Sequence, residues 1–146
     1  MIVKVKKLTE TARIPTRGSR DAAGYDLYAD LKEREVIPPH ETRMISTGLS
    51  MEIPKGYFGA IFARSGLASK ESLRPANCVG VVDSDYRGPF LIALHNDSDT
   101  QKCVEPGTRI AQMVVIPCPE ISFLETDELD TTERGEGGFG STGLTS

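Results

Sequence analysis

An acidic loop at residues 83–85 lies between two apolar segments, residues 79–82 and 89–94, and is the best candidate for a catalytic site in the chain. Branched aliphatic residues dominate both segments, and a glycine stands near each end of the turn, a pattern that predicts a β-hairpin. We expect backbone hydrogen bonds to hold Asp83 at the strand end, with its carboxylate pointing into the hairpin mouth. An ordinary turn explains the loop about equally well, because Asp and Ser favour turns through local hydrogen bonds alone.

The same loop matches the beginning of a calcium-binding EF-hand loop. Asp83, Asp85 and Gly88 occupy its first, third and sixth positions. The match fails at the fifth position, where Arg87 stands, and at the twelfth, where Leu94 replaces the bidentate glutamate. Calcium binding is therefore excluded.

Arg64, Ser65 and Gly66 stand before a series of good helix formers and form a second candidate site, for an anion. We expect a short helix with Ser65 as its N-cap, which cannot continue past Pro75. Backbone amides at the helix start would then face the same way as the Arg64 guanidinium and the Ser65 hydroxyl, as in phosphate sites. Plain N-capping is the simpler alternative.

Two lone polar residues stand in apolar surroundings. Asp26 follows Tyr25 and precedes Leu27, and is either a solvated turn acid, which is slightly favoured, or an acid near a metal. Gln112 lies in a strongly apolar segment, where a side-chain amide needs a partner. A structural hydrogen bond and a ligand contact explain Gln112 equally well.

The last glycine-rich segment, residues 134–143, combines Arg134, Phe139 and Ser141 with five glycines. Its glycine spacing fits a dinucleotide fingerprint and half of a P-loop, but both motifs require a helix afterwards, and only six residues follow Gly140. Glycine amides, a hydroxyl and a guanidinium suit phosphate oxygens, and Phe139 offers a stacking face. A disordered tail is the alternative.

The composition is that of a single domain built from many short strands. The chain has 146 residues, of which 38% are hydrophobic and 26% charged, and fourteen Gly and nine Pro interrupt it at short intervals. The segment at residues 36–39 ends in two prolines and cannot be a central strand. We find no internal repeat and no domain boundary before the tail. Strands are predicted over residues 3–6, 43–47, 49–53, 57–63, 109–116 and 121–124.

Charge and cysteine usage limit the partners and the compartment. The net charge of −4 and the pI near 5.2 argue against a general nucleic-acid-binding protein, which needs a basic face. No apolar segment approaches the ~18–20 residues of a membrane span, and residues 1–7 are unlike a signal peptide. Cys78, Cys103 and Cys118 are scattered and odd in number, which favours reduced thiols and a cytoplasmic protein.

Taken in order, five segments resemble the five motifs of the trimeric deoxyuridine triphosphatases (dUTPases). The resemblance runs from Ala22 to Gly143, and the third and fifth motifs are highly specific. It implies an all-β, jelly-roll-like distorted β-barrel of many short strands with one short helix, assembled as a homotrimer. Residues 1–130 would form the barrel and residues 131–146 a tail that closes over the active site. The five segments are AGYDL, ARSGLA, residues 77–88, GxRxAQ and RGxGGFGSTG.

The resemblance also implies an activity. The family hydrolyses dUTP to dUMP and pyrophosphate with Mg²⁺ by attack of water on the α-phosphorus, which supplies dUMP and keeps uracil out of DNA. Asp83 would be the general base, a role worth ~10²–10⁴-fold in rate. Asp26 would hold Mg²⁺ through metal-bound water.

Roles for the remaining motif residues follow from the same resemblance. The uracil would be bound by Asn77, Gly80, Val81, Val82 and Leu91, and the deoxyribose would pack on Tyr86, which would reject ribonucleotides. The phosphates would be bound by Arg64, Ser65, Gly66 and Gln112, and the closing tail would contribute Arg134 on the γ-phosphate, Phe139 on the uracil, Gly140 and Ser141.

Departures from the family pattern are small, and two other functions stay open. Pro89 stands where the family often has a polar or acidic residue, and we expect Asp85 and Arg87 to form a structural ion pair. The related dCTP deaminases share the fold, and an ammonia assay on dCTP would identify one. A nucleotide-responsive binding protein is the other alternative, although no extra partner-binding insertion is evident. Neither direct nucleic-acid binding nor a membrane partner is expected.

Overall fold

The computed structural model describes residues 1–77 and 79–138, and within them the chain is mostly β with one short helix, as predicted. The helix is α1 (Ser65–Glu71). The strands are β1 (Lys4–Lys7), β2 (Thr16–Arg17), β3 (Tyr25–Tyr28), β4 (Glu35–Ile37), β5 (Thr42–Ser46), β6 (Leu49–Glu52), β7 (Tyr57–Phe62), β8 (Leu73–Pro75), β9 (Gly80–Val82), β10 (Leu91–Asn96), β11 (Lys102–Val104) and β12 (Arg109–Pro117).

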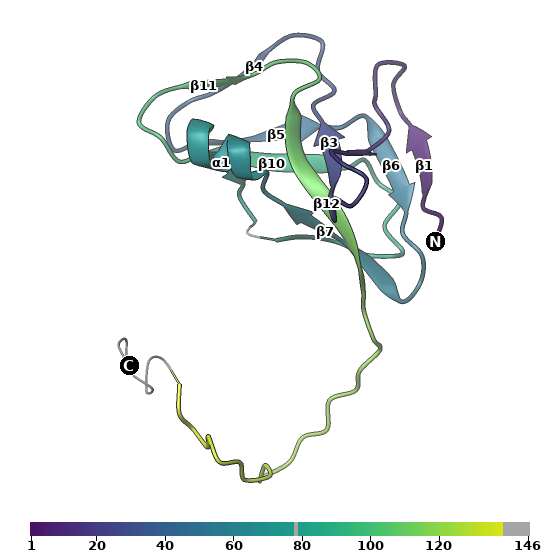
Figure 1. Ribbon diagram of the computed structural model, residues 1–146, viewed down its shortest axis with the longest axis vertical. Coiled ribbons are helices and arrows are strands. Elements are labelled where there is room, and N and C mark those ends of the chain that lie inside the picture. The colour runs from purple at the N-terminus through teal and green to yellow at the C-terminus, as the bar shows by residue number, and fades with distance from the viewer. Residues whose placement is uncertain (78, 139–146) are drawn as a thin grey trace.

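The strands form small antiparallel sheets around one apolar core. The largest sheet has the order β2-β3-β12-β7-β9, and a second has the order β5-β10-β8. Two further pairs, β1 with β6 and β4 with β11, complete the body, in which β12 runs between β3 and β7 (Figure 1). Strand alternation produces the core: in β10, for example, Ile92, Leu94 and Asn96 are buried while their neighbours are not.

Several predicted strands are confirmed, with ends shifted by at most one residue. They correspond to β1, β5, β6, β7 and β12. The restriction placed on residues 36–39 is confirmed as well, since β4 pairs only with β11 and ends before Pro38. A proline cannot donate to a ladder, and a two-stranded edge position tolerates this loss.

The predicted β-hairpin around the acidic loop is wrong, because the two flanking strands do not pair with each other. Strand β9 pairs with β7, whereas β10 pairs with β5 and β8, so the two strands that flank the loop enter different sheets. Phe90 is held by the turn between β5 and β6, because its amide donates to Leu49 O (2.8 Å) and its carbonyl accepts from Thr47 N (3.1 Å). The flanking strands therefore diverge instead of pairing with each other.

The short helix forms where it was predicted, but Ser65 is not its N-cap. Arg64 is the N-cap, with an extended backbone (φ −90°, ψ 128°) and no side-chain capping bond, and Ser65 is the first helical residue. The helix stops before Leu73, as expected from Pro75, with Ser72 in the left-handed conformation. Ser65 is thus free of a capping role.

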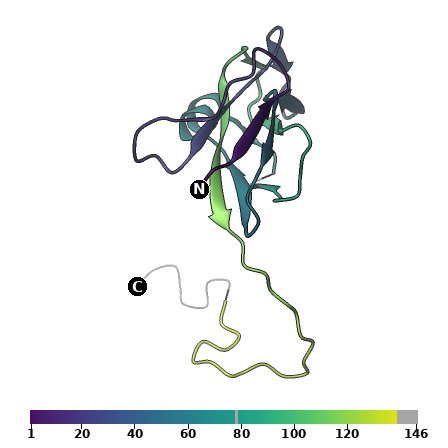
Figure 2. The same ribbon diagram turned by 90° about the vertical axis from the view of Figure 1, so that its right-hand side faces the viewer.

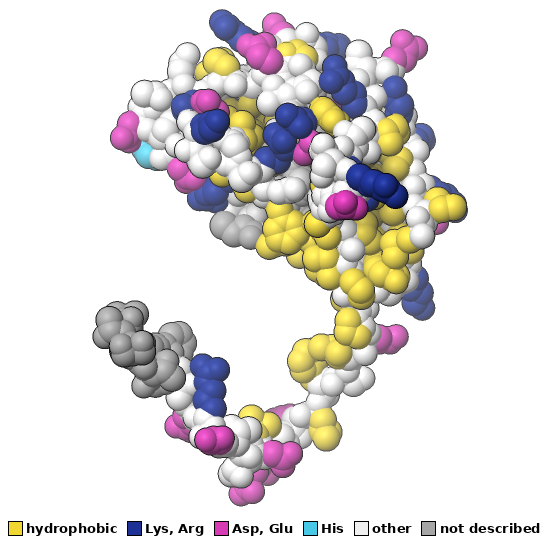
Figure 3. All heavy atoms as spheres, viewed as in Figure 1, with side chains coloured by type: hydrophobic (Ala, Val, Ile, Leu, Met, Phe, Trp, Pro, Cys, Tyr) yellow, Lys and Arg dark blue, Asp and Glu magenta, His cyan; other side chains and the backbone are white. Residues whose placement is uncertain are grey.

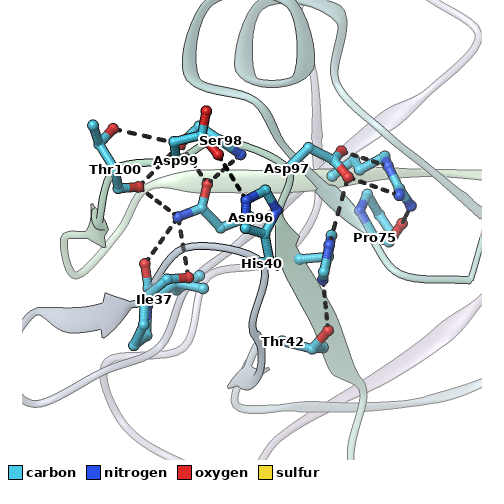
Figure 4. A network of polar contacts seen from close by, with 12 residues as sticks. Ile37, His40, Thr42, Pro75, Asn96, Asp97, Ser98, Asp99 and Thr100 are labelled. Atoms are coloured by element: carbon cyan, nitrogen blue, oxygen red, sulfur yellow. Dashed lines mark hydrogen bonds and ion pairs between the residues drawn. The ribbon is translucent and has the colours of Figure 1, made fainter.

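A buried asparagine organises the turn after β10. The Asn96 amide donates to the carbonyls of Ile37, Pro38 and Thr100, and its Oδ1 accepts from Ser98 (Figure 4). Asn96 is fully buried, and these partners satisfy its polar atoms. This network ties the end of β4 to β10 and supports the fold.

The segment after β12 extends away from the folded body in both views (Figures 1 and 2). The strand predicted at residues 121–124 is wrong, because residues 118–138 contain no strand or helix. Ile121, Phe123, Leu124 and Leu129 are exposed along this segment, at 67% to 93% of their surface. None of the strands among the described residues pairs with this segment, so it has no ladder to join.

Candidate active site

A pocket of about 280 Å³ opens between the diverging strands β9 and β10. Because these strands do not pair with each other, the edge of β9 opposite β7 has no strand partner among the described residues. Backbone N–H and C=O groups at such an edge can recognise a flat polar ligand. We name this the strand-edge pocket; it is lined by Met44, Ile61, Asn77, Gly80, Val81, Val82, Asp83, Tyr86, Pro89, Phe90, Leu91 and Ile92.

Asp83 directly follows β9 and lies at the mouth of the strand-edge pocket. It also lines a wider groove next to it, together with Ser84 and Arg87. Its carbonyl accepts from Tyr86 N at 3.2 Å, which closes a turn. The side chain is exposed and has no hydrogen-bond or ion-pair partner among the described residues. Its carboxylate is therefore available to a water molecule or a ligand.

The loop after Asp83 is held by main-chain acceptors. Arg87 donates through Nη1 to Ser84 O (2.7 Å) and Tyr86 O (2.9 Å), and Ser50 Oγ donates to Arg87 O (2.6 Å). The predicted ion pair between Asp85 and Arg87 is wrong, because the guanidinium satisfies loop carbonyls instead. A charged donor shared by two carbonyls fixes a short turn more firmly than an exposed ion pair does.

Tyr86 is fixed over one side of the strand-edge pocket. Its hydroxyl donates to Pro89 O (3.0 Å), and its ring lies 6.2 Å from that of Phe90 at an interplanar angle of 39°. The absence of a side chain at Gly88 permits this position, since a Cβ there would overlap Tyr86 Oη and lie 2.6 Å from its Cζ. Gly88 is thus required for the observed position of the ring.

A second, polar pocket of about 160 Å³ lies near the start of α1. Its central feature is Asp26, whose side chain is only 9% exposed and accepts from two guanidinium groups. Arg64 Nε lies 2.7 Å from Oδ1, and Arg109 Nη1 lies 3.2 Å from Oδ2. We name this the arginine pocket; it is lined by Gly18, Ala22, Gly24, Asp26, Arg64, Ser65 and Gln112.

Gln112 connects the arginine pocket to the start of the helix. Its Nε2 donates to Ala63 O at 2.8 Å. Gln112 therefore makes the structural hydrogen bond that was one of its two predicted roles. A Cβ on Gly24 would overlap Gln112 Oε1 and lie 3.1 Å from its Cδ, so glycine permits the amide to sit there. The same side chain lines the pocket and can contact a ligand.

Comparisons with known proteins give the family. A model of the dUTPase family matches residues 10–143. A deoxyuridine 5′-triphosphate nucleotidohydrolase of Yarrowia lipolytica is 49% identical over 146 residues, covering 99% of this chain and 90% of the relative. The enzyme of that name from Oryza sativa subsp. japonica is 50% identical over 145 residues, covering 98% and 81%. The chain belongs to the dUTPase family.

Solved structures of dUTPases agree with the fold. The dUTPase of Staphylococcus bacteriophage 80alpha with dUpNHpp has a TM-score of 0.89 and 32% identity, over 98% of this chain and 99% of that chain. The dUTPase from phage phi11 of S. aureus has a TM-score of 0.81 and 26% identity, over 90% of this chain and 100% of that chain. The fold is therefore that of the dUTPase family.

The site residues that the resemblance to dUTPases predicted fall into three groups by their location in this chain. Asp83 and the residues predicted to bind uracil and sugar line the strand-edge pocket, whereas most of those predicted to bind phosphate or metal line the arginine pocket. The two pockets share no lining residue. Gly66 follows Ser65 in α1, and Arg134 lies in the extended segment, where its Nε donates to Gly137 O (2.8 Å). Phe139, Gly140 and Ser141 lie outside the described residues.

The slightly favoured prediction that Asp26 is a solvated turn acid is wrong. Asp26 lies within β3 opposite Gln112 and is buried with two cationic partners. Burial of a carboxylate requires such partners. Arg109, which provides one of them, received no role from the sequence, although it stands in the GxRxAQ segment.

The described residues offer no chelating set for a resident metal ion. No group of three His, Cys, Asp or Glu side chains comes together in that part of the chain. Both oxygens of Asp26 already accept from arginine, so a cation here is better placed to contact this carboxylate through water than directly. No helix within the described residues is long and apolar enough to span a membrane.

Proposed function

We propose that this chain hydrolyses dUTP to dUMP and pyrophosphate, with Asp83 as the general base for the water that attacks the α-phosphorus. The observation that carries the proposal is the free carboxylate of Asp83 at the mouth of a pocket with an unpaired strand edge. Relatives of nearly the same length are named for this reaction, and a phage dUTPase binds the analogue dUpNHpp. The activity supplies dUMP and keeps uracil out of DNA.

The strand-edge pocket suits uracil for reasons of hydrogen bonding and space. Uracil presents acceptor, donor and acceptor groups along one edge, which main-chain groups of residues 80–82 and the Asn77 amide can match. The exocyclic amino group of cytosine would meet an unmatched donor, and buried mismatches of this kind are costly. A close fit of the bound ring against Leu91 would exclude the 5-methyl group of thymine. Tyr86 then packs on the deoxyribose, where a 2′-hydroxyl would collide with it.

The arginine pocket suits the triphosphate. Arg64 uses only Nε on Asp26, so its two terminal nitrogens have no partner among the described residues and can donate to phosphate oxygens. Ser65 and Gln112 line the same pocket and provide neutral donors, and Gly66, the next residue of α1, would add its backbone amide. Mg²⁺ would neutralise the triphosphate charge and orient its oxygens, and Asp26 would hold the ion through bound water.

The two pockets support a homotrimer with shared sites. Ile61 lines the strand-edge pocket, and Gln112, which lines the arginine pocket, stands opposite Phe62, the next residue of β7. Consecutive strand residues point to opposite faces of a sheet, so the side chains of Ile61 and Gln112 project in opposite directions, which argues against one nucleotide occupying both pockets of the same chain. A neighbouring subunit would bring its arginine pocket to this strand-edge pocket, as closed cyclic symmetry allows.

The extended segment also favours assembly. Ile121, Phe123 and Leu124 are largely exposed on the isolated chain, and hydrophobic side chains gather on the body near the point where this segment leaves it (Figure 3). Exposed apolar surface of this extent marks an interaction site. In the trimer, residues 1–130 would form the jelly-roll-like barrel and residues 131–146 would close over a site, with Arg134 on the γ-phosphate, Phe139 on uracil, and Gly140 and Ser141 beside the phosphates. The cytoplasmic location stays a prediction.

A nucleotide panel tests the proposed function. Release of pyrophosphate is measured with dUTP, dTTP, UTP and dCTP, with and without a chelator of divalent cations. We expect turnover of dUTP to exceed that of each other nucleotide by at least about a hundredfold, because the pocket loses hydrogen bonds or collides with each analogue, and we expect the chelator to suppress it. Equal turnover of dTTP or UTP would contradict the pocket assignment, and ammonia release from dCTP would identify a deaminase.

Substitution of Gly88 by alanine tests the role of Tyr86 in sugar selection. The added methyl group displaces the ring from its bond to Pro89, so we expect the preference for dUTP over UTP, as a ratio of kcat/KM, to fall about tenfold. Tyr86→Phe is the matched control, because it keeps the ring in place and removes only the hydroxyl; its preference should stay within about twofold. An unchanged preference in Gly88→Ala would remove Tyr86 from sugar selection.

A further inference from the structure

A β-bulge in strand β12 places Arg109 on the face of the sheet that carries Asp26. Along the pairing with β3, Gln112 stands opposite Asp26 and Ala111 opposite Leu27, but the next partner of Tyr28 is Arg109 instead of Ile110. Opposite residues share a face, and Tyr28 is two residues from Asp26. Arg109, Asp26 and Gln112 therefore share one face.

The burial of the neighbouring residues shows what the bulge changes. Ile110 and Ala111 are consecutive and both fully buried, and the register of β12 against β3 shifts between Arg109 and Ala111. Without the extra residue, Ile110 would stand opposite Tyr28 and Arg109 would point to the opposite face, where Leu27 is buried. Bulges commonly re-aim side chains beside active sites. This one gives Asp26 its second cation.

The second cation changes both the charge and the geometry of the arginine pocket. Asp26 and Arg64 alone would form a neutral pair, with no excess charge to attract an anion. Arg109 leaves the three side chains with a net positive charge. It also occupies Oδ2 (3.2 Å), so that Oδ1 stays on Arg64 Nε (2.7 Å). An isolated carboxylate could rotate and take the terminal nitrogens of Arg64 away from the pocket.

We propose that Arg109 is a positioning residue for triphosphate binding: by holding Oδ2 of Asp26, it keeps Arg64 oriented toward the phosphates. The inference rests on the proposed function, since it concerns the phosphate end of the same substrate. Arg109 itself acts through Asp26.

The test compares ligands with and without phosphates in the full-length protein. Equilibrium binding of dUpNHpp and of deoxyuridine is measured for the wild type, Arg109→Gln and Arg109→Lys, with the Tm of each. We expect Arg109→Gln to weaken dUpNHpp about tenfold, as loss of one hydrogen bond to a charged group does, and to leave deoxyuridine within about twofold. Arg109→Lys, which keeps the charge, should recover part of the loss.

A double-mutant cycle with Asp26→Asn separates positioning from direct contact. If Arg109 acts through Asp26, then Arg109→Gln should change dUpNHpp affinity by less than about twofold in the Asp26→Asn background. The same tenfold loss in that background would overturn the proposal, because it would mean direct contact with phosphate.

The remaining outcomes are distinct from each other. Normal dUpNHpp affinity in Arg109→Gln, with an active wild type, would overturn the role of Arg109 and leave the proposed function intact. Equal loss of both ligands with a lowered Tm in both variants would make Arg109 a structural residue only. A wild type that neither hydrolyses dUTP nor binds dUpNHpp would overturn the proposed function and this inference with it.

Discussion

Replacement of Asp83 by asparagine should lower kcat for dUTP by about 10²–10⁴-fold and leave KM within about twofold. Asparagine keeps the size and the hydrogen-bonding capacity of the side chain but cannot accept a proton from the attacking water. Because Asp83 stands at the pocket mouth with no partner among the described residues, its loss disturbs no contact of the fold. Steady-state pyrophosphate release measures kcat and KM, and the Tm of the variant shows whether the fold is undisturbed.

Asp85→Asn is the matched control for Asp83→Asn. Asp85 lies two residues further along the same exposed loop, but it does not line the strand-edge pocket. Its substitution by asparagine removes the same negative charge as Asp83→Asn does. Its kcat should stay within about twofold of the wild type. If both variants lose activity equally, the negative charge of the loop would matter and Asp83 would not be the base.

The position of Asp83 could be predicted from the sequence, but its surroundings could not. An acidic turn between two apolar segments is a local pattern, and the structure has a turn there. Pairing of the flanking strands is not local: β7 takes β9, and β5 and β8 take β10, although the segments are adjacent in sequence. The pocket exists because of this divergence, which only the tertiary fold decides.

The arginine pocket shows the same limit more clearly. Asp26 and Gln112 stood out as polar residues in apolar segments, and the structure places them opposite each other on β3 and β12. Arg109 did not stand out, since alternation along the predicted strand assigns it to the other face from Gln112. One extra residue reverses that assignment, and nothing in the segment itself marks Ile110 as the site of a bulge.

Mixed oligomers of two inactive variants should recover activity, because the two pockets of one chain serve different sites. Asp83→Asn damages the strand-edge pocket and Arg64→Gln the arginine pocket, and each alone should keep less than about 1% of wild-type activity. In a random equal mixture, about a quarter of sites combine an intact pocket of each kind from two subunits. Co-refolding the variants and measuring pyrophosphate release should therefore give about a quarter of wild-type activity.

The control pairs Asp83→Asn with Asn77→Ala, two changes in the same pocket of one chain. No subunit in that mixture carries an intact strand-edge pocket, so its activity should not exceed the sum of the two parents. Size measurement should show a mass three times the chain mass of 15.9 kDa in every sample. Absence of recovery in the Asp83→Asn and Arg64→Gln mixture, with exchanged trimers present, would mean that one chain builds a whole site.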